Sequence, residues 1–136
     1  MKSILLSLLF FISLTSEKRK LTVEVKSIPN EKGNIFIGLF RPKDDFPIFG
    51  KQYIGKIISV SGKKMSYSFA ELAEGKYAVA VFHDENKNGI LDKNYLGIPT
   101  EAYGFSNNAR RTFSAPSFKE AEVNLNSDLA ISITLK

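Results

Sequence analysis

Apolar and polar residues alternate along several short segments of the chain. In LTVEVKSI, for example, Leu21, Val23 and Val25 are separated from one another by single polar residues. A period of two places such apolar side chains on one face of a β-strand. Because turn-forming residues separate these segments, the pattern predicts about seven short strands. The predicted strands cover residues 21–28, 33–40, 56–60, 65–69, 76–83, 121–126 and 129–136.

The segment KYAVAVFH, residues 76–83, is apolar on both faces of its predicted strand. We therefore expect a central strand that is covered on both sides. The whole pattern predicts an all-β fold, a single antiparallel β-sandwich of about seven strands that is transthyretin-like (prealbumin-like) or immunoglobulin-like. Tyr77 follows Gly75 at the start of the central strand. In sandwich folds a tyrosine at such a corner bonds to the main chain just before its strand, so we expect this of the Tyr77 hydroxyl.

The first 16 residues have the composition of a secretory signal peptide. Lys2 precedes an apolar run at residues 4–14, which is too short to span a bilayer as a helix of roughly 20 residues. Small residues follow it, and a charged run begins at Glu17. We expect cleavage near Ser16, a mature single domain of residues 17–136 without a membrane span, and export to the periplasm or the cell surface. An uncleaved anchor is the alternative.

The composition excludes several kinds of site. The chain has no cysteine, which excludes disulfides, thiolate metal sites and cysteine nucleophiles. It has one histidine, so it cannot form a multi-histidine zinc site by itself. The formal net charge of +5 comes from scattered cations. Without a recognisable nucleic-acid-binding motif, this excess does not indicate a nucleic-acid partner.

The segment HDENKNGILD, residues 83–92, places short oxygen-bearing side chains at alternate positions before a glycine, Gly89. This spacing is typical of the first part of a calcium-binding loop, in which alternate side chains point inward and glycine permits the sharp turn. The candidate calcium ligands are Asp84, Asn86, Asn88 and Asp92. The loop also resembles those of calcium-binding β-sandwich repeats in bacterial surface proteins.

The match to a calcium loop is incomplete. Tyr95 stands where a bidentate glutamate would close the ligand set, and Glu85 and Glu101 are the available additional carboxylates. The affinity expected of so few carboxylates is about 0.1–1 mM, which is useful only outside the cytoplasm. The alternative is a metal-free polar turn, because Asn88-Gly89 is a strong hairpin signal.

A second candidate site is YGFSNNAR, residues 103–110, within a stretch from 94 to 119 that shows no periodicity. Its aromatic, amide and arginine side chains could form an exposed patch that binds a glycan, a peptide or an envelope protein. The candidate ligand-binding residues are Tyr103, Phe105, Asn107, Asn108 and Arg110, together with His83. Alternatively, this stretch covers a sheet edge. In that case Phe105, Phe113 and Phe118 would enter the core, while the two asparagines and the arginine would bond to the main chain.

His83 and Asp84 raise the hypothesis of a small hydrolase. The chain has neither a Gly-x-Ser-x-Gly motif nor a cysteine to supply the nucleophile. We therefore expect His83 to hydrogen-bond loop carbonyls or Asp84 instead of acting in catalysis.

The stretch from Gly75 to Arg110, followed by APSFKEAEV, resembles the domain-of-unknown-function family 2141, whose members are small secreted bacterial proteins. The resemblance extends from Leu21 to Lys136. Its most specific parts are HDEN (83–86), LGIP (96–99) and YGFSNNAR (103–110), whereas Arg111 and Thr112 stand where a glycine or small residue is expected. The resemblance implies an exported β-sandwich and supplies no activity.

From the sequence we therefore expect an uncharacterised extracytoplasmic β-sandwich that is a non-enzymatic binding or structural module, with a candidate calcium loop at 84–92. Calcium is the one cofactor expected. The alternatives are a carbohydrate- or peptide-binding protein that uses residues 103–110, and a small hydrolase.

Overall fold

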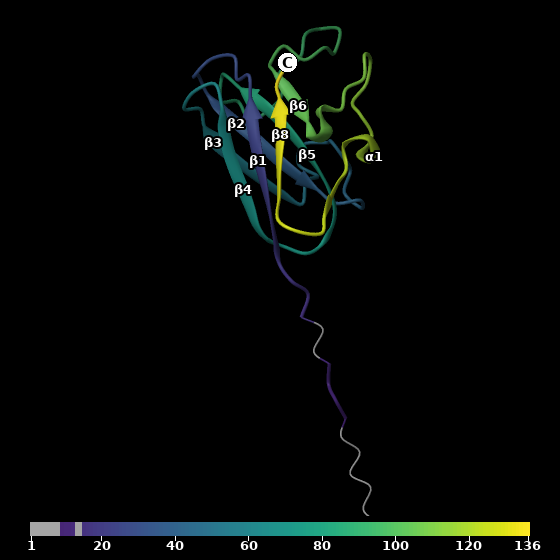
Figure 1. Ribbon diagram of the computed structural model, residues 1–136. Coiled ribbons are helices and arrows are strands. Elements are labelled where there is room, and N and C mark those ends of the chain that lie inside the picture. The colour runs from purple at the N-terminus through teal and green to yellow at the C-terminus, as the bar shows by residue number, and fades with distance from the viewer. Residues whose placement is uncertain (1–8, 13–14) are drawn as a thin grey trace, which may run out of the picture.

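The computed structural model describes residues 9–12 and 15–136, which form a nearly all-β structure (Figure 1). Two short helices, η1 (Ser106–Asn108) and α1 (Phe118–Ala121), follow one another in the second half of the chain. The strands are β1 (Arg19–Lys26), β2 (Asn34–Phe40), β3 (Ile54–Ser59), β4 (Met65–Leu72), β5 (Gly75–Asp84), β6 (Tyr103–Phe105), β7 (Val123–Leu125) and β8 (Leu129–Thr134). Every segment predicted as a strand overlaps one of them.

The strands form two sheets. One has the order β4-β1-β8, and the other has five strands, in the order β3-β2-β5-β6 with β7 also paired to β5. The prediction of a purely antiparallel fold is wrong for one pair, because β1 and β8 run parallel, with Leu21 beside Leu129. The reason is that β7, which precedes β8, belongs to the other sheet. The chain therefore reaches β8 from the other sheet and not through a hairpin, so no tight turn imposes an antiparallel direction on β8.

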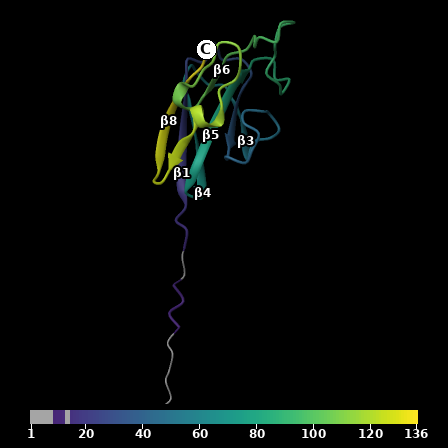
Figure 2. The same cartoon turned by 90° about the vertical axis from the view of Figure 1, so that its right-hand side faces the viewer.

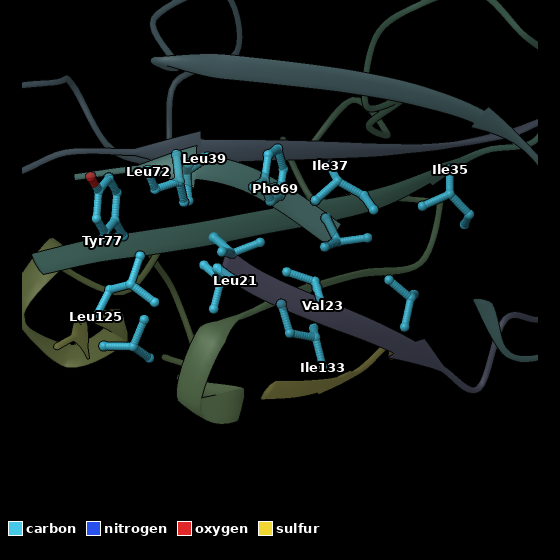
Figure 3. Close-up of a cluster of buried hydrophobic side chains, with 14 of the residues drawn as sticks. Leu21, Val23, Ile35, Ile37, Leu39, Phe69, Leu72, Tyr77, Leu125 and Ile133 are labelled. Carbon is cyan, nitrogen blue, oxygen red and sulfur yellow. The ribbon is translucent and has the colours of Figure 1, made fainter. Parts of the chain in front are cut away.

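Both sheets contribute side chains to one hydrophobic cluster (Figure 3). Leu21, Val23 and Val25 of β1 are fully buried in it, as their alternation predicts. The odd-numbered residues Val79 and Val81 of β5 belong to the same cluster. These positions confirm the predicted period of two on the strands that face this core.

The central strand β5 is buried on both faces, which was also predicted. Its even-numbered residues Ala78 and Ala80 pack in a second cluster with Phe40, Phe105 and Ala121. Two of these residues lie in β6 and α1, so the stretch between β5 and β7 covers the face of β5 that the other sheet does not. A near-continuous apolar run on β5 follows from this double cover.

The corner before β5 has the predicted tyrosine contact. The Tyr77 hydroxyl donates a hydrogen bond to the Ala73 carbonyl oxygen at 2.7 Å, while its ring lies in the main core. The bond satisfies the one polar atom of a side chain that is only 5% exposed, and it fixes the turn that starts β5.

Strand β6 was not predicted. It has three residues, Tyr103–Phe105, which pair with Ala80–Phe82 of β5. Strand β7 is equally short, but the alternation around it continues through residues 121–126, whereas polar residues at 101 and 107 end any alternation around β6.

The segment between β5 and β6 projects from one end of the molecule, and the N-terminal segment leaves the opposite end (Figures 1 and 2). Of the predicted signal peptide, residues 1–8 and 13–14 lie outside the described residues. Within residues 9–12 and 15–136, no helix is long and apolar enough to cross a membrane.

Candidate functional site

The candidate calcium loop begins at the last residue of β5. The Asp84 carboxylate accepts hydrogen bonds from the main-chain N–H groups of Asn88, at 3.1 Å, and Gly89, at 2.8 Å. Lys87 and Gly89 both have a positive φ, of 57° and 79°, which turns the chain around this carboxylate. The side chain is 4% exposed and well satisfied, so Asp84 is the inner anchor of the loop.

The structure brings the other three predicted ligands together. Asp92 accepts one hydrogen bond from the Asn86 amide at 2.8 Å and another from the Asn88 amide at 2.7 Å. The two amides therefore present nitrogen to Asp92, while their oxygens accept main-chain N–H groups within the loop. In this arrangement the loop is closed by its own hydrogen bonds. The described residues contain no group of three or more His, Cys, Asp or Glu side chains that could hold a metal ion.

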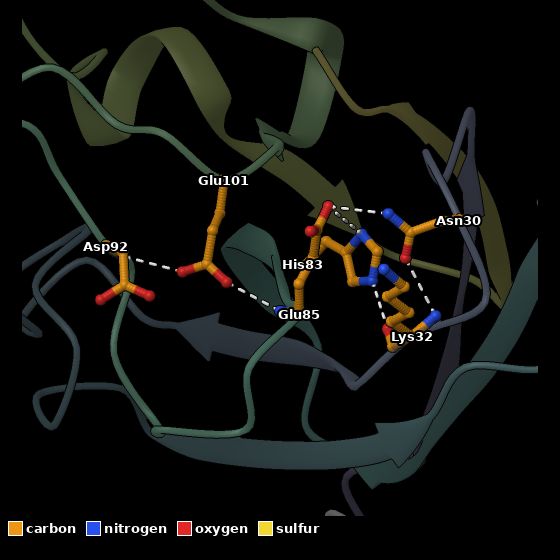
Figure 4. A network of polar contacts seen from close by, with 6 residues as sticks. All are labelled: Asn30, Lys32, His83, Glu85, Asp92 and Glu101. Carbon is orange, nitrogen blue, oxygen red and sulfur yellow. Dashed lines mark hydrogen bonds and ion pairs between the residues drawn. The ribbon is translucent and has the colours of Figure 1, made fainter.

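Glu101 connects the two ends of this loop through hydrogen bonds (Figure 4). One of its carboxylate oxygens accepts the N–H of Glu85 at 2.7 Å, and the other accepts the N–H of Asp92 at 2.8 Å. Burial is the main cause that raises the pKa of Glu101, and the neighbouring Asp92 raises it further. The sequence suggested Glu101 only as an additional ligand, because nothing in the pattern shows that its carboxylate bridges the main chain of residues 85 and 92.

The pKa of Asp92 is shifted in the opposite direction to that of Glu101. The hydrogen bond from the Asn88 amide is the main cause that lowers the pKa of Asp92 below its ordinary value, and the Asn86 amide lowers it further. A carboxyl group whose pKa is lower in the folded state stabilises the fold above its ordinary pKa. This stabilisation is lost as the pH falls through the lower, folded value.

We expect Asp92→Asn to lower the melting temperature at pH 7, and we expect this deficit to shrink as the pH falls below the ordinary pKa of an aspartate, because the stabilisation that comes with the lowered pKa is lost in that range. Thermal melts between about pH 2 and pH 7 measure this difference. Asp45→Asn, which removes the same charge from an exposed side chain, serves as the control. A deficit of the Asp92 variant that stayed constant down to pH 2 would contradict the role assigned to its charge.

His83 is fully buried beside the candidate loop. Its Nε2 lies 2.6 Å from the carbonyl oxygen of Lys32, which confirms the predicted bond to a loop carbonyl. The alternative bond to Asp84 is not formed, because that carboxylate turns towards Asn88 and Gly89. The Nδ1 atom has no hydrogen-bond partner among the described residues, and the nearest Glu85 oxygen is 3.8 Å away (Figure 4). Because the ring is fully buried, a substrate could reach it only after the residues around it had moved.

The segment 103–110 is fixed against both sheets. Asn107 donates to the Glu120 and Glu122 carbonyl oxygens, and Asn108 accepts the N–H of Thr134 at 2.9 Å. These contacts confirm the alternative in which both asparagines satisfy the main chain. None of them reaches the candidate calcium loop, so the asparagines of this segment do not complete its ligand set.

The aromatic residues from 103 to 118 lie in three kinds of environment. Phe105 is 7% exposed and lies in the second hydrophobic cluster, and Phe118 packs against the same cluster, as predicted for edge cover. The corresponding prediction for Phe113 is wrong, since its side chain is 99% exposed on an irregular loop. The ring of Tyr103 is covered by the Arg110 guanidinium, 4.4 Å from the ring centre. Phe105 therefore offers no open face for stacking on a sugar, and Arg110 already occupies one face of Tyr103.

A cavity of about 210 Å³ adjoins this segment. It lies where β6 and η1 meet the end of β8. Two of the predicted ligand-binding residues with polar side chains, Asn108 and Arg110, line it. The remaining lining residues are Gly104, Phe105, Ala109, Thr134 and Lys136. The sequence could not show the contribution of Thr134 and Lys136, because only the pairing of distant segments brings them here.

Comparison with known protein families finds a match. The family described as uncharacterised proteins conserved in bacteria, domain of unknown function 2141, matches residues 23–132. No curated protein matches the chain. No solved structure matches it either.

Proposed function

Because the chain belongs to the bacterial family known as domain of unknown function 2141, which has no assigned activity, we propose its function from its own site geometry. The proposal is an exported, non-enzymatic binding module whose loop at 84–92 binds calcium. We also infer that its two sheets form a single β-sandwich of the transthyretin or immunoglobulin type, since both contribute to one core. The signal-peptide-like N-terminus supports export, where calcium at millimolar concentration is available.

The observation that carries the calcium proposal is the convergence of the four predicted ligands on one turn. Asp92 lies within 2.8 Å of both the Asn86 and the Asn88 amides, and Asp84 is held by two main-chain N–H groups of the same turn. A carboxylate oxygen has about two lone-pair sites, so a single hydrogen bond leaves room for a cation. Calcium accepts six to eight oxygen ligands, and water completes such a set in weak sites.

Calcium binding requires a small rearrangement of the two amides. Asn86 and Asn88 now direct nitrogen at Asp92, and rotation about the terminal side-chain torsion would direct oxygen inward instead. That torsion has two broad minima, so the rotation costs little. The loop main chain, fixed at both ends by Glu101, can remain in place.

A thermal melt in chelator and in about 5 mM calcium tests the proposal. With a Kd of about 0.1–1 mM, calcium should stabilise the fold by about 1–2 kcal/mol and raise the melting temperature by about 5 °C. Asp84→Ala should abolish this shift, whereas Asp45→Ala should retain it. Magnesium at the same concentration should have little effect, because it demands a tighter octahedral geometry. Identical melts with and without calcium would refute the proposal.

The cavity beside 103–110 favours a second candidate function, the binding of a small ligand. It is bordered by Asn108 and Arg110, which the sequence had already suggested for ligand recognition. Burial of Phe105 and cover of Tyr103 argue against recognition by aromatic stacking and direct attention to the polar groups.

A further inference from the structure

The cavity of about 210 Å³ lies at a seam between the edge strands of the two sheets. Tyr103 of β6 and Lys136, just after β8, exchange two main-chain hydrogen bonds of 3.1 Å. Nearby, the Asn108 side-chain oxygen accepts the N–H of Thr134. These bonds hold the walls of the cavity from both sheets, so its shape is formed before any ligand binds.

Arg110 is held in place at this cavity. One terminal nitrogen of its guanidinium donates to the Tyr103 carbonyl oxygen at 2.6 Å, and the group lies over the Tyr103 ring. Among the described residues this is the single hydrogen bond that Arg110 makes. A guanidinium has five N–H donors in a planar fork, so most of them remain free for a ligand.

The remaining polar groups of the cavity favour a negatively charged ligand. Because the Asn108 oxygen is occupied by Thr134, the free end of this amide is its nitrogen, a donor. Lys136 also lines the cavity, its main-chain oxygen is occupied by the N–H of Tyr103, and no aspartate or glutamate is among the lining residues. Phe105 and Ala109 supply apolar surface for the body of the ligand.

We propose that this cavity binds a small carboxylate, with Arg110 and the Asn108 amide as the donors to its oxygens. The proposal rests on the second candidate function and does not depend on calcium. A planar carboxylate matches the planar guanidinium fork. At about 210 Å³ the cavity is smaller than the roughly 300–1,000 Å³ that is typical of pockets for larger ligands, so the ligand is a single small acid, either an acidic sugar or a simple organic acid.

The test is a titration of the ¹⁵N-labelled protein, followed by the amide NMR signals of Gly104 and Ala109, in chelator and at constant ionic strength. The probes are galacturonate, acetate, galactose and inorganic phosphate. We expect galacturonate to shift these signals with a Kd of about 1–10 mM, as a ligand of roughly ten heavy atoms can achieve. Galactose, which lacks the carboxylate, should not shift them. Acetate binding as tightly as galacturonate would assign the site to simple organic acids, and weaker acetate binding to acidic sugars.

Arg110→Gln should weaken galacturonate binding at least about tenfold, because it removes the charged donor. Arg111→Gln removes the same charge from the next residue, which pairs with Glu120 instead, and should bind like the wild type. Asn108→Asp provides a second variant. It retains the acceptor for Thr134 but places a carboxylate at the cavity, and it should abolish binding while the melting temperature stays close to that of the wild type.

Three outcomes would overturn the proposal. One is the absence of any carboxylate-dependent shift in the wild type. Another is equal weakening by Arg110→Gln and Arg111→Gln, which would show only non-specific attraction. The third is tighter binding of inorganic phosphate than of either carboxylate. Because the titration is done in chelator, its result is independent of the calcium melts.

Discussion

Gly33→Ala is expected to lower the free energy of unfolding by about 3 kcal/mol. Gly33 lies in the turn between β1 and β2, with a φ of +68°, and this left-handed conformation costs a residue with a Cβ about 1–2 kcal/mol. An added Cβ would also lie 2.0 Å from the Asp84 carbonyl oxygen and 2.7 Å from the Glu85 Cα. Because both are main-chain atoms, the turn would have to move, at a further cost of about 1–3 kcal/mol.

Gly97→Ala is the matched control for this prediction. Gly97 has a φ of +77°, but an added Cβ there would meet no atom within 4 Å. It should therefore cost only the conformational part, about 1 kcal/mol. Urea denaturation measures the free energy of unfolding of both variants. Equal losses of unfolding free energy would show that the close approach of Gly33 to the start of the candidate calcium loop adds nothing to the cost of Gly33→Ala.

Ser106→Ala is expected to destabilise the fold by about 2–4 kcal/mol. The Ser106 hydroxyl is fully buried, accepts the N–H of Val79 at 2.9 Å and donates to the Ala121 carbonyl oxygen at 2.5 Å. Val79 lies on β5 between the stretch that pairs with β6 and the stretch that pairs with β7. The hydroxyl thus replaces the missing strand partner there. Alanine would leave two buried main-chain groups without partners, at about 1–3 kcal/mol each.

Ser132→Ala provides the comparison for Ser106. Its hydroxyl donates to Glu24 at 3.2 Å on an exposed surface, and its removal should change stability by less than about 0.5 kcal/mol. Urea denaturation of the two variants separates a buried hydroxyl from an exposed one. A loss below 1 kcal/mol for Ser106→Ala would mean that water reaches Val79 and Ala121 once the hydroxyl is removed.

Much of the sheet structure could be predicted because burial imposes a period of two. Leu21, Val23 and Val25 show this period clearly, and Tyr77 marks its corner by its distance from Gly75. The parallel pairing of β1 with β8 could not be predicted in the same way, since a strand's own pattern shows which face is buried and not the direction of its neighbour.

The candidate sites could be predicted only as far as their ligands are local in sequence. The loop at 84–92 brings its four oxygen-bearing residues together within one turn, so spacing alone indicated it. Glu101, Thr134 and Lys136 reach their sites through pairing with distant segments. The burial of Phe105 and the exposure of Phe113 likewise depend on which of the two lies on the short strand β6, and that strand has no pattern of its own.

The parallel pairing of β1 with β8 has a consequence for the order of folding. The first strand is hydrogen-bonded on one side to β4 and on the other to the last strand of the domain. During synthesis, the three-stranded sheet therefore stays incomplete until the C-terminal residues have emerged. Pairings between such distant segments form slowly, because a long loop must be closed before any contact compensates for its entropy. A chain with this connectivity cannot complete the edge of its three-stranded sheet until its last strand is available to pair with its first.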